Sequence, residues 1–95
     1  MLGVLFYESA DDVVETAPVH FAAHSAYADA HHEAGDLLWL GTFADPVADG
    51  SMAVFVSPDA AEAFATDDPF VLNGVVKSWR VLAWNEVYAA EVQQR

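Results

Sequence analysis

The sequence predicts an α+β fold with the element order βαββαβ, and three observations support this prediction. Short apolar runs typical of strands occur near residues 2–7, 36–43, 52–56 and 75–88. Segments with helical spacing separate the first run from the second and the third from the fourth. The intervening Asp-Pro and Asp-Gly pairs at residues 45–50 favour a turn, so the second and third strands are expected to form a hairpin.

The first half of the chain is expected to hold a strand, a long helix and a second strand. The first strand is Leu2–Tyr7, and the turn that follows it leads into a helix between about Val13 and Ala34. Gly35 comes directly after this helix and suits a left-handed C-terminal cap. Pro18 favours a first helical turn, so we expect a break there and a main helix from Pro18 to Ala34. Asp36–Phe43 is the second strand.

The second half is expected to hold a strand, a short helix and a long last strand. After the third strand, Met52–Val56, Ser57 and Pro58 suit the start of a helix that runs to about Ala65. Residues 67–70 interrupt this helix, and residues 71–74 form a connector. The last strand is Val75–Tyr88. This order is the ferredoxin-like arrangement, a four-stranded antiparallel sheet with two helices on one face.

Both faces of the predicted sheet are apolar. In the first strand Leu2, Val4 and Phe6 point to one side, and Leu5 and Tyr7 point to the other. The last strand shows the same pattern, with Val76, Leu82 and Trp84 opposite Val75, Trp79, Val81 and Ala83. Two helices cover only one face, so the open face is expected to meet the sheet of an identical subunit. Face-to-face packing of this kind gives a dimeric α+β barrel.

Length and charge restrict the class of protein further. Ninety-five residues predict a single domain, 1–95. Fifteen acidic residues against three basic ones give a net charge of −12, which argues against nucleic-acid and membrane-surface partners. The apolar start ends at Glu8 without a basic segment, so it is expected to be a strand in a cytoplasmic protein and not a signal peptide.

All four histidines, His20, His24, His31 and His32, lie in the first predicted helix. At about 100° per residue, His24 falls on the apolar stripe that faces the sheet. One interpretation is a core histidine bonded to a backbone carbonyl or water; the other is a proton-transfer group, since histidine changes charge near neutral pH. His20 and His24 could grip one metal ion, but further ligands are lacking, so no metal site is predicted.

Asp68 is the second candidate because the following Pro69 restricts it to extended geometry, which fixes the direction of its carboxylate. The alternative is a turn or capping aspartate. Phosphate-binding loops, nucleophile elbows and cysteines are absent from the sequence. Proton transfer by a histidine and an aspartate is therefore the chemistry that the residue types permit, and no cofactor is expected.

Several segments, in order and at compatible spacing over residues 2–88, resemble the YciI-like (YCII-related) family. They are Ala23-His24, His32-Glu33-Ala34-Gly35, Leu37-Leu38-Trp39-Leu40-Gly41, Asp67-Asp68-Pro69-Phe70 and Val81-Leu82-Ala83-Trp84. The resemblance implies a dimeric α+β barrel with an active site formed by His24 and Asp68. The family is similar in fold to muconolactone isomerases and includes a dehydrochlorinase of a chlorinated hydroquinone, which implies proton abstraction on small, often aromatic, rings.

The chain departs from the family pattern in two places. The family's Arg-Pro-Ala-His is Phe21-Ala22-Ala23-His24 here, so an arginine that could bind an anionic substrate is missing. The family's Gly-Pro after the second strand is Gly41-Thr42, and Thr42 can donate a hydrogen bond. The expected substrate-binding residues are Thr42, Trp39, Phe70 and Tyr27.

Two functions follow as hypotheses. The first is an isomerase or a lyase of the dehydrochlorinase type, in which His24 and Asp68 carry out general acid/base chemistry on a small apolar or aromatic molecule. The alternative is a ligand-binding or accessory dimer without catalysis.

Overall fold

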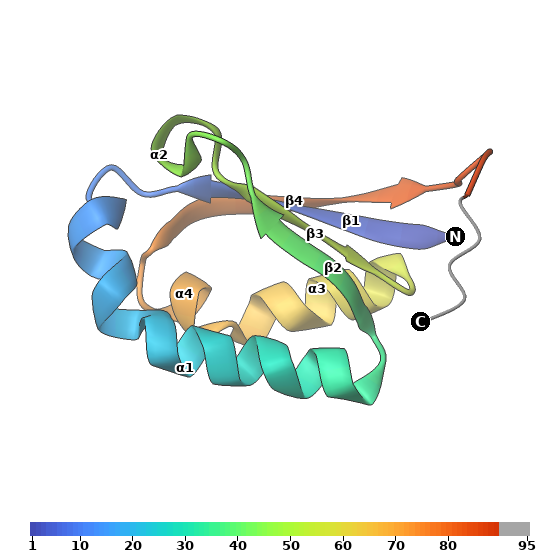
Figure 1. Ribbon diagram of the computed structural model, residues 1–95, viewed down its shortest axis with the longest axis horizontal. Coiled ribbons are helices and arrows are strands. Elements are labelled where there is room, and N and C mark those ends of the chain that lie inside the picture. Colours follow the sequence, from blue (N-terminus) through green and yellow to red (C-terminus); the bar gives the residue numbers. More distant parts are fainter. Residues whose placement is uncertain (90–95) are drawn as a thin grey trace.

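A four-stranded antiparallel sheet forms one layer of the protein, in the strand order β2-β3-β1-β4. The computed structural model describes residues 1–89. Its strands are β1 (Leu2–Ser9), β2 (Leu37–Thr42), β3 (Ser51–Phe55) and β4 (Val76–Trp84). The helices α1 (Val13–Ala34), α3 (Pro58–Asp67) and α4 (Pro69–Leu72) lie together on one side of the sheet (Figure 1). The ferredoxin-like α+β fold predicted from the sequence is therefore confirmed.

The core lies between the central strands and α3. Leu5 of β1 is paired with Ala53 of β3 on one side and with Val81 of β4 on the other. Leu5, Phe55 and Phe64 are almost completely buried in the main hydrophobic cluster. Burial of side chains of this size stabilises the fold by about 1.5–3 kcal/mol each.

Helix α1 is continuous, which corrects the predicted break at Pro18. The helix runs from Val13 to Ala34 with Pro18 inside it. Proline cannot donate to the carbonyl of Val14, four residues earlier. Val14 is exposed, so water can bind that carbonyl. The missing hydrogen bond also falls in the first turns of the helix and not in its middle. Gly35 ends the helix in the predicted left-handed conformation, and its N–H contacts the carbonyls of His31 and His32.

The last strand is shorter than predicted because its partner ends. Trp84 of β4 pairs with Leu2 at the beginning of β1, so no backbone of β1 lies opposite the residues that follow. A register shift between Glu8 and Ser9 also turns Val76 toward the core, whereas the prediction had placed it on the same side of the strand as Leu82 and Trp84.

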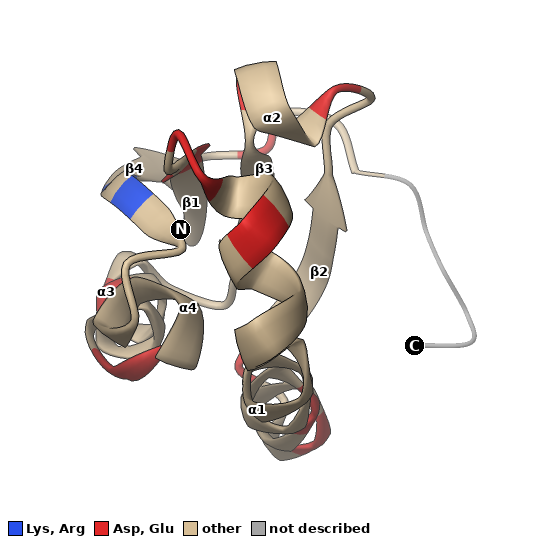
Figure 2. Ribbon diagram, turned by 90° about the vertical axis from the view of Figure 1, so that its left-hand side faces the viewer, with Lys and Arg blue, Asp and Glu red and all other residues tan. Residues whose placement is uncertain are grey.

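Two connections contain one-turn helices that the sequence analysis had assigned to a turn and a connector. α2 (Pro46–Asp49) joins β2 to β3 and begins at Asp45, whose side chain accepts from the N–H of Ala48. α4 lies between α3 and β4. Acidic residues occur on α1, on α3 and around α2 (Figure 2). Within the described residues, no helix is both long and apolar enough to span a bilayer.

Gly50, between α2 and β3, holds the end of β3 against β1. Its φ of 74° and ψ of −143° suit glycine alone, and a Cβ there would lie 1.9 Å from the carbonyl oxygen of Tyr7. We expect Gly50→Ala to lower the free energy of unfolding by about 3 kcal/mol through backbone strain and overpacking.

Urea unfolding measures the effect, and Gly41→Ala is the matched control because a Cβ at Gly41 meets nothing within 4 Å. Equal unfolding midpoints for the two variants would contradict this account of Gly50.

Candidate active site

Asp68 lies at the junction of two helices, where it ends α3 and begins α4. Its φ of −63° and ψ of 126° are extended, as expected before Pro69. The side chain turns inward and is 0% exposed. Its Oδ1 accepts a hydrogen bond from the backbone N–H of Phe70 at 2.9 Å, which caps α4. Asp68 can therefore cap α4 and also belong to the candidate site.

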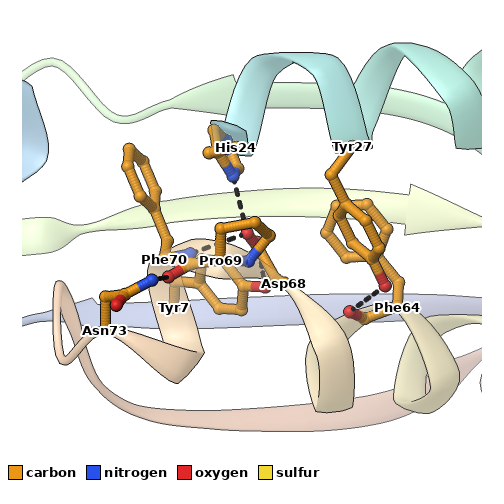
Figure 3. Close-up of polar contacts among 8 residues, drawn as sticks. All are labelled: Tyr7, His24, Tyr27, Phe64, Asp68, Pro69, Phe70 and Asn73. Atoms are coloured by element: carbon orange, nitrogen blue, oxygen red, sulfur yellow. Dashed lines mark hydrogen bonds and ion pairs between the residues drawn. The ribbon is translucent and has the colours of Figure 1, made fainter. Parts of the chain in front are cut away.

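His24 is the buried residue of α1, with 8% of its surface exposed. Its Nδ1 lies 2.8 Å from Oδ1 of Asp68, so the structure brings the two predicted residues together (Figure 3). A carboxylate only accepts hydrogen bonds, so Nδ1 carries the proton between them. In the neutral ring Nε2, on the far side from Asp68, is then the atom with a lone pair.

Phe70 fixes the plane of the histidine ring. The two rings are stacked with centroids 3.9 Å apart and an angle of 3° between their planes. Asp68 holds one edge of the imidazole and Phe70 covers one of its faces, so the ring is restrained in both position and tilt. Such restraint keeps a base oriented before its substrate arrives.

Tyr7 is a third member of the site and was missed by the sequence analysis. Its hydroxyl donates to Oδ2 of Asp68 at 2.6 Å. Burial and this hydrogen bond raise the pKa of Tyr7 far above its usual value, so the phenol stays protonated. The available signal was its place on the helix-facing side of β1, where a buried hydroxyl needs a partner.

A cavity of about 150 Å³ opens beside His24. Its walls come from β1, β2, β3, α1, α3 and α4, and they are Leu5, Tyr7, Phe21, His24, Leu40, Thr42, Ser51, Met52, Ala53, Phe64 and Phe70. Most of these side chains are apolar, with a few hydroxyls and the imidazole among them, which is the usual composition of a small-molecule pocket. An apolar cavity of about this volume can hold one benzene ring.

The predicted substrate-binding residues divide into two groups. Thr42 and Phe70 line the cavity together with His24. Tyr27 does not line it: its hydroxyl donates to the carbonyl oxygen of Phe64 at 2.8 Å, and burial raises the pKa of Tyr27 to about 12. Trp39 pairs across the strands with Val54, on the sheet face away from the helices.

The remaining histidines near the end of α1 attach the helix to β2. Nδ1 of His31 lies 2.8 Å from Oδ2 of Asp36, and Nδ1 of His32 lies 2.9 Å from the carbonyl oxygen of Leu37. In the described part of the chain, no three His, Cys, Asp or Glu residues are grouped so that they could hold a metal ion. These contacts give His31 and His32 a structural role at the end of the helix.

Comparison with solved structures finds the same fold in an enzyme. A 5-chloro-2-hydroxyhydroquinone dehydrochlorinase from Burkholderia phenoliruptrix AC1100, in complex with 2,5-dihydroxybenzoquinone, superposes with a TM-score of 0.69. The two sequences are 22% identical, and the match covers 90% of this chain and 94% of the other. No curated protein matches the sequence. The family model of the YCII-related domain matches residues 1–85, and the chain therefore belongs to the YCII-related domain family.

Proposed function

We propose that the protein is a small-molecule enzyme in which His24 acts as a general acid/base and Asp68 orients it. The observation that carries the proposal is the 2.8 Å contact between Nδ1 of His24 and Asp68 at the wall of an apolar cavity. Nucleophile, base and orienting groups are recognised by such geometry and not by their order in the sequence.

In the proposed reaction Nε2 of His24 takes a proton from an acidic C–H or O–H group of the substrate. The resulting imidazolium remains hydrogen-bonded to Asp68, whose negative charge stabilises it. In an isomerisation the proton returns to another atom of the substrate. In an elimination the electron pair of the broken C–H bond forms the new double bond, and a leaving group such as chloride departs with its own electron pair.

The substrate is proposed to be a small, uncharged, apolar or aromatic ring. The cavity volume suits one six-membered ring, and among residues 1–89 no Lys or Arg side chain lines it to pair with a carboxylate. The structural neighbour, a dehydrochlorinase bound to 2,5-dihydroxybenzoquinone, supports a ring with oxygen substituents. Thr42 and Ser51 supply hydroxyls in the cavity that can bond to such oxygens.

The experiment incubates the protein with 5-chloro-2-hydroxyhydroquinone and with unchlorinated hydroquinone, the latter as the non-reactive analogue. Release of chloride from the chlorinated compound, together with a rise in melting temperature with both compounds, would support the proposal. A rise in melting temperature without any product, across a panel of chlorinated and hydroxylated rings, would favour the ligand-binding alternative. No effect of any compound on melting temperature or product would contradict both.

We also propose that the chain forms one domain and pairs through its open sheet face with a second copy. That face carries apolar side chains from each strand: Leu2, Val4, Phe6, Trp39, Met52, Val54, Leu82 and Trp84. Leu82 is 47% exposed and Trp84 is 49% exposed in the single chain. Arg80 also lies on this face, and its guanidinium is 4.7 Å from the centroid of the Phe6 ring, a cation–π contact.

We expect Leu82→Asp to convert this dimer to a monomer. A carboxylate between the paired faces loses its hydration, at a cost of about 3 kcal/mol or more, which is about a hundredfold in Kd. Sedimentation velocity over a range of concentrations measures the change. Val19→Asp, on the exposed side of α1, is the matched control and should leave the dimer intact. A wild-type protein that sediments as a monomer at all concentrations would refute the pairing.

A further inference from the structure

We infer that Tyr7 is a positioning residue that sets the proton affinity of the His24–Asp68 pair. The two carboxylate oxygens of Asp68 have different hydrogen-bond partners. Oδ1 accepts from His24 and from the backbone N–H of Phe70. Oδ2 accepts from the Tyr7 hydroxyl at 2.6 Å. The inference deepens the proposed function, because it concerns the same pair of residues.

The carboxylate needs this hydroxyl because it is buried. Asp68 is 0% exposed, and among residues 1–89 its ion-pair partner is His24 and not a Lys or an Arg. Within the same residues Tyr7 is the one hydrogen-bond donor to Oδ2. A buried carboxylate oxygen without a donor strongly disfavours the charged form. On this inference the Tyr7 hydroxyl stabilises the charged form of the Asp68 carboxylate through its hydrogen bond to Oδ2.

The position of the hydroxyl is fixed by the sheet. Tyr7 lies in the central strand β1, where it is paired with Ser51 of β3 and Trp79 of β4. Its backbone is in close contact with Gly50. Burial and the hydrogen bond to Asp68 raise the pKa of the phenol, so Tyr7 is a protonated donor at neutral pH. The sheet and the protonation state of the phenol together keep the hydroxyl directed at Oδ2.

Loss of the hydroxyl has a predictable direction. Without it the negative charge on Asp68 is shared among fewer donors, so the pair binds its proton more tightly and releases it at higher pH. The two groups titrate as one system, so the prediction concerns the pair. Tyr27 of α1 is the titratable group that interacts with both Tyr7 and Asp68, and Asp67 and Asp36 in turn interact with Tyr27. The Tyr7→Phe substitution changes none of these groups.

The experiment follows the His24 ring by NMR as a function of pH in the wild type and in Tyr7→Phe. We expect the midpoint of the titration to rise by about one pH unit, or tenfold in proton affinity, which is the usual effect of one hydrogen bond to a charged group. Tyr27→Phe is the matched control, since its hydroxyl bonds to the Phe64 carbonyl and not to Asp68. An unchanged midpoint in Tyr7→Phe, or an equal shift in both variants, would overturn the inference.

A second measurement in the unmodified protein guards against a variant that fails to fold. The ¹³Cζ resonance of Tyr7 should shift with the same midpoint as the His24 ring, and that of Tyr27 should not follow it; a Tyr7 resonance insensitive to this transition would also overturn the inference. Neither measurement needs a substrate. If the protein turns over none of the tested rings, the titration results still stand, so the two proposals can fail separately.

Discussion

His24→Gln is expected to lower the rate of the proposed proton transfer by about 10²–10⁴-fold while the protein remains folded. The glutamine amide can still donate to Asp68, but it is not basic and cannot take a proton from the substrate. Tyr7 and the backbone N–H of Phe70 continue to bond to the carboxylate. The loss should therefore appear in kcat and not in the melting temperature.

The control is His20→Gln, one turn earlier on the same helix and outside the cavity lining. It makes the same chemical change without touching Asp68, so full activity is expected. Both variants are compared by initial rates with the compound that the wild type turns over, and by circular dichroism for folding. If His24→Gln retained wild-type turnover, His24 would not be the base.

Asp68→Ala is expected to produce the largest loss of stability, about 3–5 kcal/mol in the free energy of unfolding. Removing one partner of a buried, hydrogen-bonded pair leaves the other groups unsatisfied. Here the orphaned donors are His24 Nδ1, the Tyr7 hydroxyl and the Phe70 N–H. The N-terminal cap of α4 is lost as well, which adds about 1 kcal/mol within this range.

Urea unfolding monitored by circular dichroism measures this loss. Asp67→Ala, one residue earlier and exposed, is the matched control and should change the stability by less than about 0.5 kcal/mol. Similar midpoints for the two variants would show that Asp68 does not stabilise the junction of α3 and α4 as its contacts indicate.

The sequence predicted the fold through local patterns that the structure preserves. Helical periodicity placed His24 on the face toward the sheet, and the proline after Asp68 predicted its extended backbone; both follow from neighbouring residues. The 2.8 Å contact between them joins residues 44 positions apart and depends on how α1 packs beside α4. Periodicity cannot supply that distance, and the resemblance to the YCII-related family was what first suggested the pair.

Other features depend on contacts that composition does not reveal. Tyr7 was read only as a strand residue, because its partner on α3–α4 becomes visible only after the helices pack. Trp39 and Tyr27 are aromatic and therefore looked like pocket residues. Trp39 instead pairs on the far face of the sheet, and Tyr27 packs against α3. Pro18 was expected to break α1, but its missing N–H affects a carbonyl that water can reach.

Asp68 serves the architecture as well as the proposed chemistry, and this affects how the family diverges. A relative that had lost its reaction would be free to replace the histidine, whereas the aspartate would still be needed to cap α4 and to satisfy the tyrosine beside it. Persistence of the aspartate in a distant sequence is therefore weak evidence of activity. In a search for working enzymes of this kind, the imidazole position is the better marker.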